Sequence, residues 1–252
     1  MQLTDQLSVG ASLILGTSFL DGPFVGNSAM MPDYALRGSL GAAYQLDTYT
    51  TVGAYWQTKR SFTFDDAISI GGGPFQDINF EHPENLGFGI ANGALMDGRL
   101  LLAADVLFKR YSEADFFQAI YDDQWVFQVG SQFAPNARVR FRLGYAYAEN
   151  IMRDLPGASV GGVVPPSVEY VQAQFAAINQ HRMTGGIGVR DALPGIDLDL
   201  FAGGMFDTSD TFGTTSASVA SYWVGAGLTW RFGRGACCGN CAPDQWCTTC
   251  LR

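Results

Sequence analysis

Arg138-Val139-Arg140-Phe141-Arg142-Leu143-Gly144-Tyr145-Ala146-Tyr147 is the stretch that decides the fold class of this chain. Successive side chains of a β-strand point to opposite faces, so its three arginines share one face. The apolar and aromatic residues of the stretch fall on the other face. A strand with one polar face and one aromatic-rich apolar face is typical of an outer-membrane β-barrel, whose outside meets lipid and whose inside holds water.

The same alternation recurs along the whole chain and predicts ten strands. Each segment is long enough to cross a bilayer, for which a tilted strand needs about 9–11 residues. The sequence therefore predicts an all-β protein, an antiparallel transmembrane β-barrel of the outer-membrane type. The predicted strands are 7–19, 34–46, 49–62, 84–95, 99–111, 124–134, 137–150, 179–190, 196–207 and 220–232.

Short and long connections alternate between these strands, as in bacterial barrels with short periplasmic turns and long outer loops. Asp97-Gly98 predicts a type I′ hairpin turn, whose two central residues both need positive φ. An even strand number places both ends of the barrel wall on the periplasmic side. The other short connections are Asp47-Thr48, Pro135-Asn136 and Asp191 to Gly195, and the long ones are 20–33, 63–83, 112–123, 151–178 and 208–219.

Alternation alone does not say which face lies inside. A soluble β-sandwich or a lipocalin-like barrel also alternates, but its apolar face points inward. Strand length, aromatic apolar faces and loop asymmetry favour the membrane barrel. The side chains expected to face the lumen are then Arg37, Lys59, Asp105, Lys109, Arg138, Arg140, Arg142, Arg190, Asp197, Asp199 and Arg231.

Composition narrows the class of protein further. The net charge of −9 argues against a nucleic-acid partner, which would call for a basic face. No run of about 18 apolar residues predicts a transmembrane helix. The first residues, Met1 to Asp5, carry no secretory signal, although an outer-membrane protein must cross the inner membrane. We therefore expect this chain to be a mature or truncated form.

Several segments resemble the FadL-type outer-membrane transporters of hydrophobic compounds. The first has the Pro-x-x-Leu-Gly start of a family strand, and a later one ends in Gly-Tyr-x-Tyr. Together the segments cover about residues 35–232, in the order and spacing of the family. They are Pro83 to Gly89, Leu101 to Ser112, Asp123 to Gly130, Asn136 to Tyr147, Gln180 to Gly188 and Leu228 to Phe232.

The resemblance carries expectations about fold and function. Members of that family are 14-stranded barrels with an N-terminal plug, so this chain would correspond to the last ten strands. It implies passive transport of hydrophobic small molecules, such as long-chain fatty acids or aromatic hydrocarbons. The expected partners are such a ligand and the lipid of the bacterial outer membrane, in which the protein would be integral. No cofactor is implied, and the oligomeric state stays open.

Two groups of residues are candidates for ligand binding. Lumen cations would suit a fatty carboxylate, because charge-assisted hydrogen bonds strengthen where water is excluded. Alternatively, these cations pair with carboxylates of neighbouring strands. Apolar loop residues would either capture a ligand first or pack together to cap the barrel mouth. The lumen candidates are Lys109, Arg138, Arg140 and Arg142, and the loop candidates are Phe19, Phe24, Phe116 and Phe117.

Other functions remain as alternatives to a hydrophobic transporter. One is a porin-like pore for polar solutes, and another is a structural barrel without transport. A third is an outer-membrane hydrolase, in which His181 would act with an acidic pair such as Asp122-Asp123 or with a serine. No acidic residue adjoins His181 in its strand, so structural histidines are favoured and no enzyme is expected.

The chain divides into a barrel, residues 1–235, and a cysteine-rich tail, residues 236–252. The tail has two Cys-x-x-Cys pairs with a short gap between them. Zinc binding, disulfides in an oxidising periplasm and an unstructured appendage are all open for it. Its cysteines are Cys237, Cys238, Cys241, Cys247 and Cys250.

Overall fold

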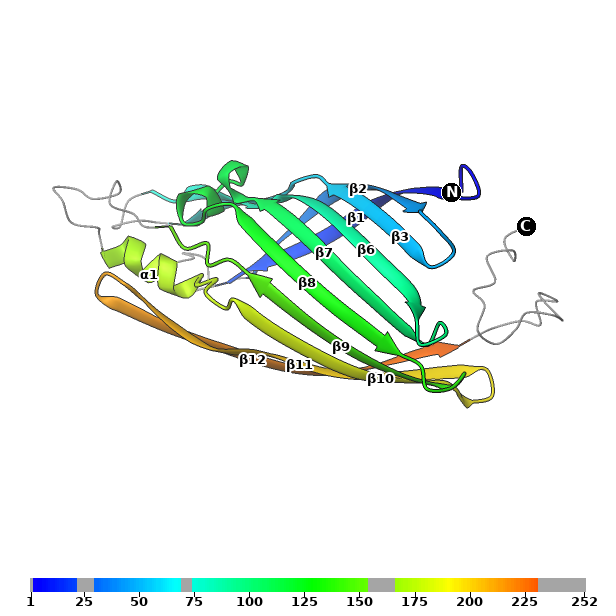
Figure 1. The fold of residues 1–252 in the computed structure, drawn as a ribbon. Helices are drawn as coiled ribbons and strands as arrows, with labels where there is room; N and C mark the ends of the chain where they lie inside the picture. The colour runs from blue at the N-terminus through cyan, green and yellow to red at the C-terminus, as the bar shows by residue number, and fades with distance from the viewer. Residues whose placement is uncertain (1, 22–29, 69–73, 154–165, 231–252) are drawn as a thin grey trace.

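The main element of the computed structural model, which describes residues 2–21, 30–68, 74–153 and 166–230, is a curved ten-stranded antiparallel sheet (Figure 1). Within this sheet each strand pairs with the sheet's next strand in chain order, so the predicted antiparallel arrangement is confirmed. The strands are β1 (Leu7–Leu20), β2 (Met31–Gln45), β3 (Thr50–Gln57), β6 (Glu84–Leu95), β7 (Leu100–Arg110), β8 (Gln124–Phe133), β9 (Val139–Ala148), β10 (His181–Leu193), β11 (Ile196–Phe212) and β12 (Thr215–Trp230).

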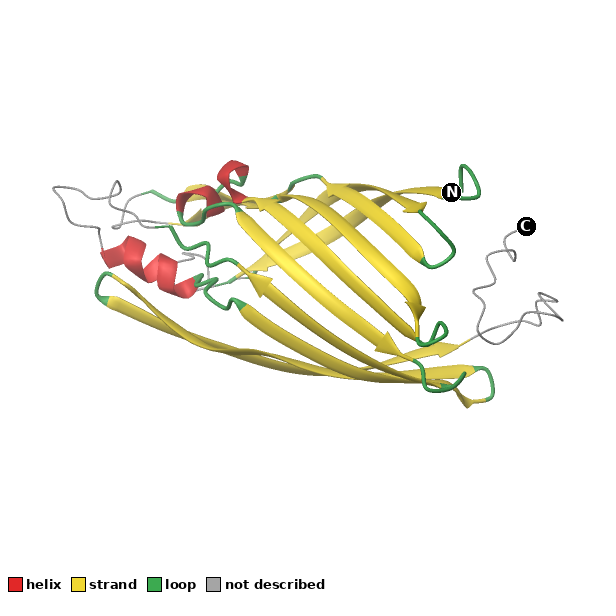
Figure 2. Cartoon of the chain, in the orientation of Figure 1, coloured by secondary structure: helices red, strands yellow, loops and turns green. Residues whose placement is uncertain are grey.

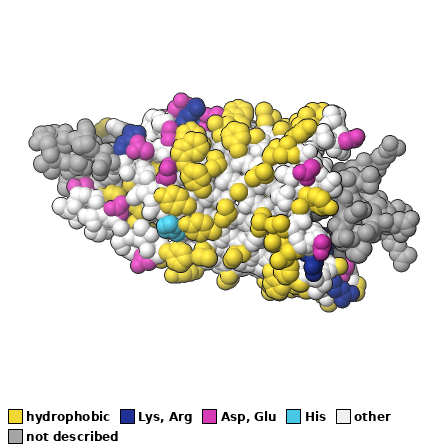
Figure 3. Space-filling view, in the orientation of Figure 1, with side chains coloured by type: hydrophobic (Ala, Val, Ile, Leu, Met, Phe, Trp, Pro, Cys, Tyr) yellow, Lys and Arg dark blue, Asp and Glu magenta, His cyan; other side chains and the backbone are white. Residues whose placement is uncertain are grey.

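The apolar face of the sheet points outward, as predicted for a membrane barrel and opposite to a soluble sandwich. On β12, Tyr222 is 80% exposed, Val224 85% and Leu228 73%. Hydrophobic side chains cover the middle of the face in Figure 3, and charged ones lie nearer its two ends. Within the described residues, the two clusters of buried hydrophobic side chains lie at the loop end: one consists of connection residues, and the other joins the segment between β3 and β6 to Ala35 of β2.

Cross-strand registers fix the inner face. Arg142 of β9 is paired with Gly186 of β10, which is paired with Phe201 of β11. The residues between them, such as Phe141 and Ile187, form the outer row. The predicted inward placement of Arg140, Arg142, Asp197 and Asp199 follows directly from this register.

The short connections gather at one end of the sheet, where β1 begins and β12 ends (Figure 1). In the turn after β6, the Arg99 amide donates to the Met96 carbonyl at 3.1 Å. The central residues Asp97 and Gly98 have φ of +56° and +81°, which confirms the positive φ predicted for both. At the β2–β3 turn the Asp47 carboxylate accepts the Tyr49 and Thr50 amides, which lowers its pKa.

The long loop predicted at 208–219 is wrong. Strands β11 and β12 continue through it as a hairpin and turn at Gly213, whose φ is +60°. Polar pairs replace the expected alternation here: Ser218 donates to Asp207 at 2.6 Å, and Thr211 contacts Ser216 at 3.1 Å. The extension consists mostly of polar residues and therefore gives no alternating signal. Its polar character is consistent with a position beyond the apolar zone of the wall.

The strand predicted at 49–62 is also wrong in its second half. Strand β3 ends at Gln57, and the chain then enters a separate two-stranded sheet made of β4 (Arg60–Ile68) and β5 (Gln76–His82). Phe62 and Phe64 do alternate in a strand, but that strand belongs to a hairpin that is not part of the ten-stranded wall. The predicted loop 63–83 contains the rest of that hairpin.

The connections predicted at 112–123 and 151–178 carry short helices (Figure 2). Two 3₁₀ turns, η1 (Tyr111–Glu113) and η2 (Phe117–Ala119), follow β7, and α1 (Pro166–Gln174) lies in the connection predicted as a loop at 151–178. No helix in the described ranges is long and apolar enough to cross a membrane. Phe24, Gly71 to Gly73, Arg231, Phe232 and the cysteine tail lie outside the described residues.

Candidate functional site

An aromatic cluster fills the loop end of the molecule. Phe80 of β5 lies 4.5 Å from Phe116 between ring centroids, and Phe116 lies 5.1 Å from Phe175. Phe117 stacks on Tyr121 at 5.3 Å. Three connections far apart in sequence therefore share one apolar patch, and each such ring pair contributes about 0.5–1.5 kcal/mol beyond its burial. We call Phe80, Tyr111, Phe116, Phe117, Tyr121 and Phe175 the aromatic cluster.

Burial within this cluster affects its tyrosines. It raises the pKa of both Tyr111 and Tyr121 because the ionised phenolate would lose its water. The Tyr121 hydroxyl donates to the Phe175 carbonyl, which joins the connection after β7 to the segment after α1. Both phenols therefore stay neutral at physiological pH and act as apolar groups with one polar end.

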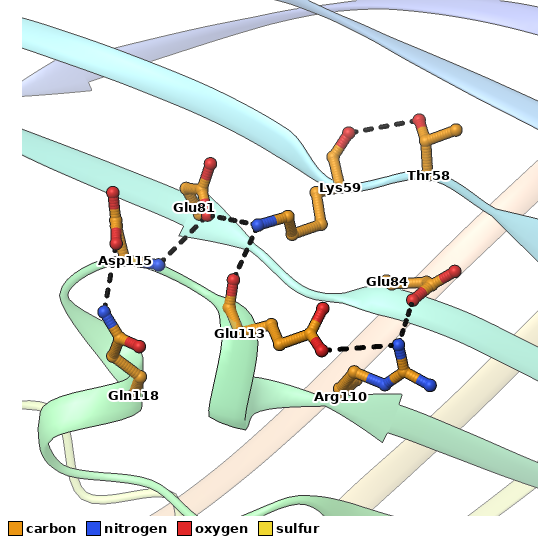
Figure 4. A network of polar contacts seen from close by, with 8 residues as sticks. All are labelled: Thr58, Lys59, Glu81, Glu84, Arg110, Glu113, Asp115 and Gln118. Carbon is orange, nitrogen blue, oxygen red and sulfur yellow. Dashed lines mark hydrogen bonds and ion pairs between the residues drawn. The ribbon is translucent and has the colours of Figure 1, made fainter.

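A polar network joins β5 to the connection after β7, and both contribute rings to the cluster (Figure 4). Glu81 of β5 pairs with Lys59 at 3.0 Å and accepts the Asp115 amide at 3.1 Å. The Lys59 ammonium also donates to the Glu113 carbonyl at 2.7 Å. Each of these partly exposed contacts stabilises by no more than about 1 kcal/mol, but together they tie β5 to the connection after β7.

Two cations lie on the inner face at this end of the sheet. Register places Lys109 between Asn85 and Gln124, and it places Arg182 on the row of Gly186. Arg182 is close enough to Lys109 to interact with it electrostatically. Within the described residues neither cation has a carboxylate partner at ion-pair distance, and the Arg182 Nε atom is buried without a hydrogen bond. Two cations that face the lumen from β7 and β10 within electrostatic range of each other, without a carboxylate partner among the residues described, favour an anionic group between them.

The lower wall of the lumen holds a second set of charges that is paired. Arg142 donates to Asp199 at 2.5 Å and to Gln132 at 2.9 Å. To reach Asp199 it crosses β10 at Gly188, where an added Cβ would lie 2.5 Å from the Asp199 carboxylate. For Arg142 the alternative expectation, pairing with a neighbouring strand, therefore has direct support.

The other predicted lumen arginines have different positions. Arg140 lies beside Arg190 and Arg142 and near Asp197 and Asp199, on the same wall. Arg138 precedes β9, and its amide donates to the Asn136 side chain at 2.9 Å in the short turn. Arg138 thus lies at the rim, because the strand starts one or two residues later than the alternation suggested.

A cavity of about 840 Å³ lies on the sheet and includes inner-face residues of β1, β2, β3, β6 and β7. Much of that inner wall is small, with Gly10, Ser12 and Gly41 among its residues. Tyr55 and Asp105 also line it, and each lies over a glycine of β6 that leaves room for it. This volume lies in the range of sites that take a drug-sized molecule.

The predicted capture residues divide into three cases. Phe116 and Phe117 are half-buried members of the aromatic cluster. Phe19 is not a loop residue: it belongs to β1 and is 61% exposed on the outer row, because the alternation of β1 continues to Leu20. Phe24 lies outside the described residues.

Three site residues were not predicted from the sequence: Arg182, Phe80 and Phe175. Arg182 shares the parity of Arg190 along β10, so that signal was present in the alternation. Phe80 and Phe175 lie in connections, where no period relates them to the wall, and only the folded structure brings them together.

The groups considered for a hydrolase have other partners. The Tyr145 hydroxyl and His181 Nδ1 are 2.7 Å apart on the outer row of the wall. Asp122 pairs with Arg153 at 2.9 Å, and Asp123 accepts the Ser112 amide at 2.8 Å. This geometry presents His181 to the bilayer side as part of an aromatic group.

An antiparallel wall with outward apolar rows, short turns at one end and packed connections at the other defines an outer-membrane type of β-barrel fold. The solved structures confirm the predicted FadL-type fold. A TodX deltaS2S3 mutant, described as a monoaromatic hydrocarbon channel, is similar with a TM-score of 0.62 at 19% identity. The match covers 92% of this chain and 68% of that one.

Two further structures are similar. The Ralstonia pickettii toluene transporter TbuX has a TM-score of 0.60 at 19% identity, covering 92% of this chain and 65% of that one. A Pseudomonas aeruginosa FadL homologue has a TM-score of 0.53 at 14% identity, covering 90% and 64%. The chain thus spans about two thirds of their length. No protein-family model matches it, and no curated protein matches it by sequence.

Proposed function

We propose that this protein is an integral outer-membrane channel that transports hydrophobic small molecules passively and without catalysis. The observation that carries this proposal is the arrangement of the loop end. It combines the aromatic cluster, a pair of lumen cations without a carboxylate partner in the described ranges (Lys109 and Arg182) and a lumen cavity. Ligand movement would follow its concentration gradient, because nothing in this arrangement calls for an energy source.

The cation pair narrows the substrate class to amphiphiles with an anionic head, of which a long-chain fatty carboxylate is the simplest. Lys109 and Arg182 would bind the carboxylate, while the apolar tail contacts Phe116 and Phe117. The similar structures include toluene transporters, whose substrate is wholly apolar. Such a ligand would use the aromatic cluster and the cavity but not the cations.

Transport would begin at the aromatic cluster, whose rings meet an apolar ligand at the outer surface. The ligand then passes the cation pair and enters the cavity beside Tyr55 and Asp105. Small side chains along this wall leave space without offering tight polar contacts that would hold a ligand back. Arg140 and Arg142 come later on this path, and a ligand role for them stays a prediction.

Binding measurements on the purified protein test this proposal. We expect Lys109→Ala and Arg182→Ala each to weaken dodecanoate binding by about tenfold, because each removes one charge-assisted hydrogen bond. Binding of dodecanol should stay unchanged in calorimetry. Arg110→Ala is the matched control, since Arg110 adjoins Lys109 but faces outward and pairs with Glu84 at 3.1 Å. Unchanged dodecanoate affinity in both variants would reject the carboxylate site.

A porin-like pore for polar solutes is the second candidate. The observation that favours it is the charged lower wall with Arg140, Arg142 and Asp199. A porin would show large, salt-dependent conductance in planar bilayers, whereas we expect the hydrophobic channel to show little.

A further inference from the structure

The β4–β5 hairpin packs against the inner face of the barrel wall. Phe62 and Phe64 are 1% and 2% exposed, and they form one buried cluster with Ala35 of β2. Ala35 lies two residues from inward-facing Arg37 and is paired with Gly16 of β1, so it belongs to the lumen row. The most completely buried phenylalanine rings of the described chain therefore lie inside the barrel, not behind the sheet.

Polar contacts hold the hairpin to the same wall. The Asp33 carboxylate accepts the Thr63 amide at 2.7 Å. The Arg60 guanidinium lies over Gly16, where an added Cβ would come within 2.4 Å of it. Gly16 therefore has a specific role, since any side chain there would displace Arg60 from the wall.

Arg37 fixes the points where the hairpin leaves and rejoins the sheet. Its guanidinium donates to the Thr58 carbonyl at 2.8 Å and to the Pro83 carbonyl at 2.5 Å. One inward side chain thus binds both ends of a 24-residue excursion, residues 59–82, and turns it toward the lumen.

The hairpin also reaches the connections attached to the other strands. Phe80 contacts Phe116 and Phe175, and Glu81 accepts the Asp115 amide, as Figure 4 shows for the polar contact. Phe116 follows β7, and Phe175 precedes β10. The hairpin is therefore held on one side by β1 and β2 and on the other by connections of β7 and β10, so it extends across the mouth.

We propose that strands β4 (Arg60–Ile68) and β5 (Gln76–His82) form an internal plug that closes the loop end of the lumen to ions and polar solutes. Its buried phenylalanines hold it against the wall, and its other side offers aromatic surface to an apolar ligand. The plug would exclude hydrated ions while leaving the aromatic cluster as the entry for hydrophobic molecules. This proposal concerns permeability to polar solutes and goes beyond the proposed function.

Excision of the hairpin is the direct experiment. Gln57 of β3 is paired with Asn85 of β6, so replacing residues 59–83 by Asn-Gly leaves Thr58 opposite Glu84 across a two-residue turn and keeps the strand pairing. We expect single-channel conductance in planar bilayers to rise severalfold, and small sugars to enter liposomes that the unmodified protein leaves closed.

A second variant keeps the chain length unchanged. Phe62→Ser with Phe64→Ser should release the hairpin from the wall and raise conductance as excision does. Phe75→Ser is the matched control, because Phe75 lies next to β5 but is 44% exposed, and we expect it to have no effect. If folded forms of both the excised protein and the double variant conduct like the unmodified protein, the plug assignment is wrong.

These measurements use salt and sugars only. A channel that fails to bind dodecanoate could still show the conductance increase, and a true fatty-acid channel could fail to show it. The two proposals therefore fail on separate observations.

Discussion

At the residue scale, single glycines decide which charges can pair across the wall. Gly188 lets the Arg142 side chain cross β10 and reach Asp199, because a Cβ there would overlap the carboxylate. The same logic places Gly16 beneath Arg60. Only the register identifies which glycines make room for which side chain.

We predict that Gly188→Val breaks the Arg142–Asp199 pair and lowers the free energy of unfolding by about 1 kcal/mol, since the pair is partly exposed. Denaturant unfolding in detergent micelles measures the change. Gly185→Val is the matched control: Gly185 is on the outer row of the same strand, where an added Cβ meets nothing closer than 3.9 Å. Equal losses in both variants would argue against the crossing.

His82 gives the plug a predicted pH dependence. Burial, with Arg60 and Arg37 nearby, lowers its pKa below the ordinary value of 6.5, so the docked hairpin favours the neutral ring. Because the released hairpin binds the proton more readily, docking is unaffected above pH 6.5 and weakens as pH falls below it. We therefore expect conductance to increase as the pH is lowered from 7.5 to 5. The His82→Asn variant should not show this increase. A pH response that survives in His82→Asn would assign it to other groups.

At the element scale, α1 holds the tip of the long β11–β12 hairpin. Glu169 is buried, and its carboxylate accepts both the Thr214 amide at 3.0 Å and the Thr214 hydroxyl at 2.8 Å. We predict that Glu169→Ala increases amide hydrogen exchange at residues 208–219, because two charge-assisted bonds are lost. Tyr170→Ala, at an exposed neighbour, should leave exchange there unchanged. Equal exchange in the two variants would mean that α1 does not hold this tip.

The wall strands and their short turns could be predicted because a period of two and a Gly-containing turn are local signals. The β4–β5 hairpin could not be assigned to the lumen, since Phe62 and Phe64 alternate as a wall strand would. The extension of β11 beyond Phe206 gave no signal, because residues 207–211 are all polar and show no alternation. Part of the site followed from sequence: Lys109, Phe116 and Phe117 were predicted, and the alternation of β10 also carried a signal for Arg182. Phe80 and Phe175 needed the fold.

At the scale of the whole molecule, the structure separates into an outer apolar surface, a cavity with small inner residues and a loop end where the connections pack together. This arrangement suits a bilayer, because outward Leu and Phe side chains lose nothing in lipid while the inner face keeps its polar groups from it. The direction of the apolar rows is thus the physical basis of both proposals.

Tryptophan quenching in lipid vesicles tests that direction most directly. Trp125 lies on the outer row beside Phe108, and Trp223 lies on the inner row over Gly203. In two variants that each keep one of these tryptophans, with the other four replaced by Phe, we predict that brominated lipid quenches Trp125 strongly. Trp223 should respond to aqueous acrylamide and not to the lipid. Strong lipid quenching of Trp223, with Trp125 protected, would contradict an outward apolar face.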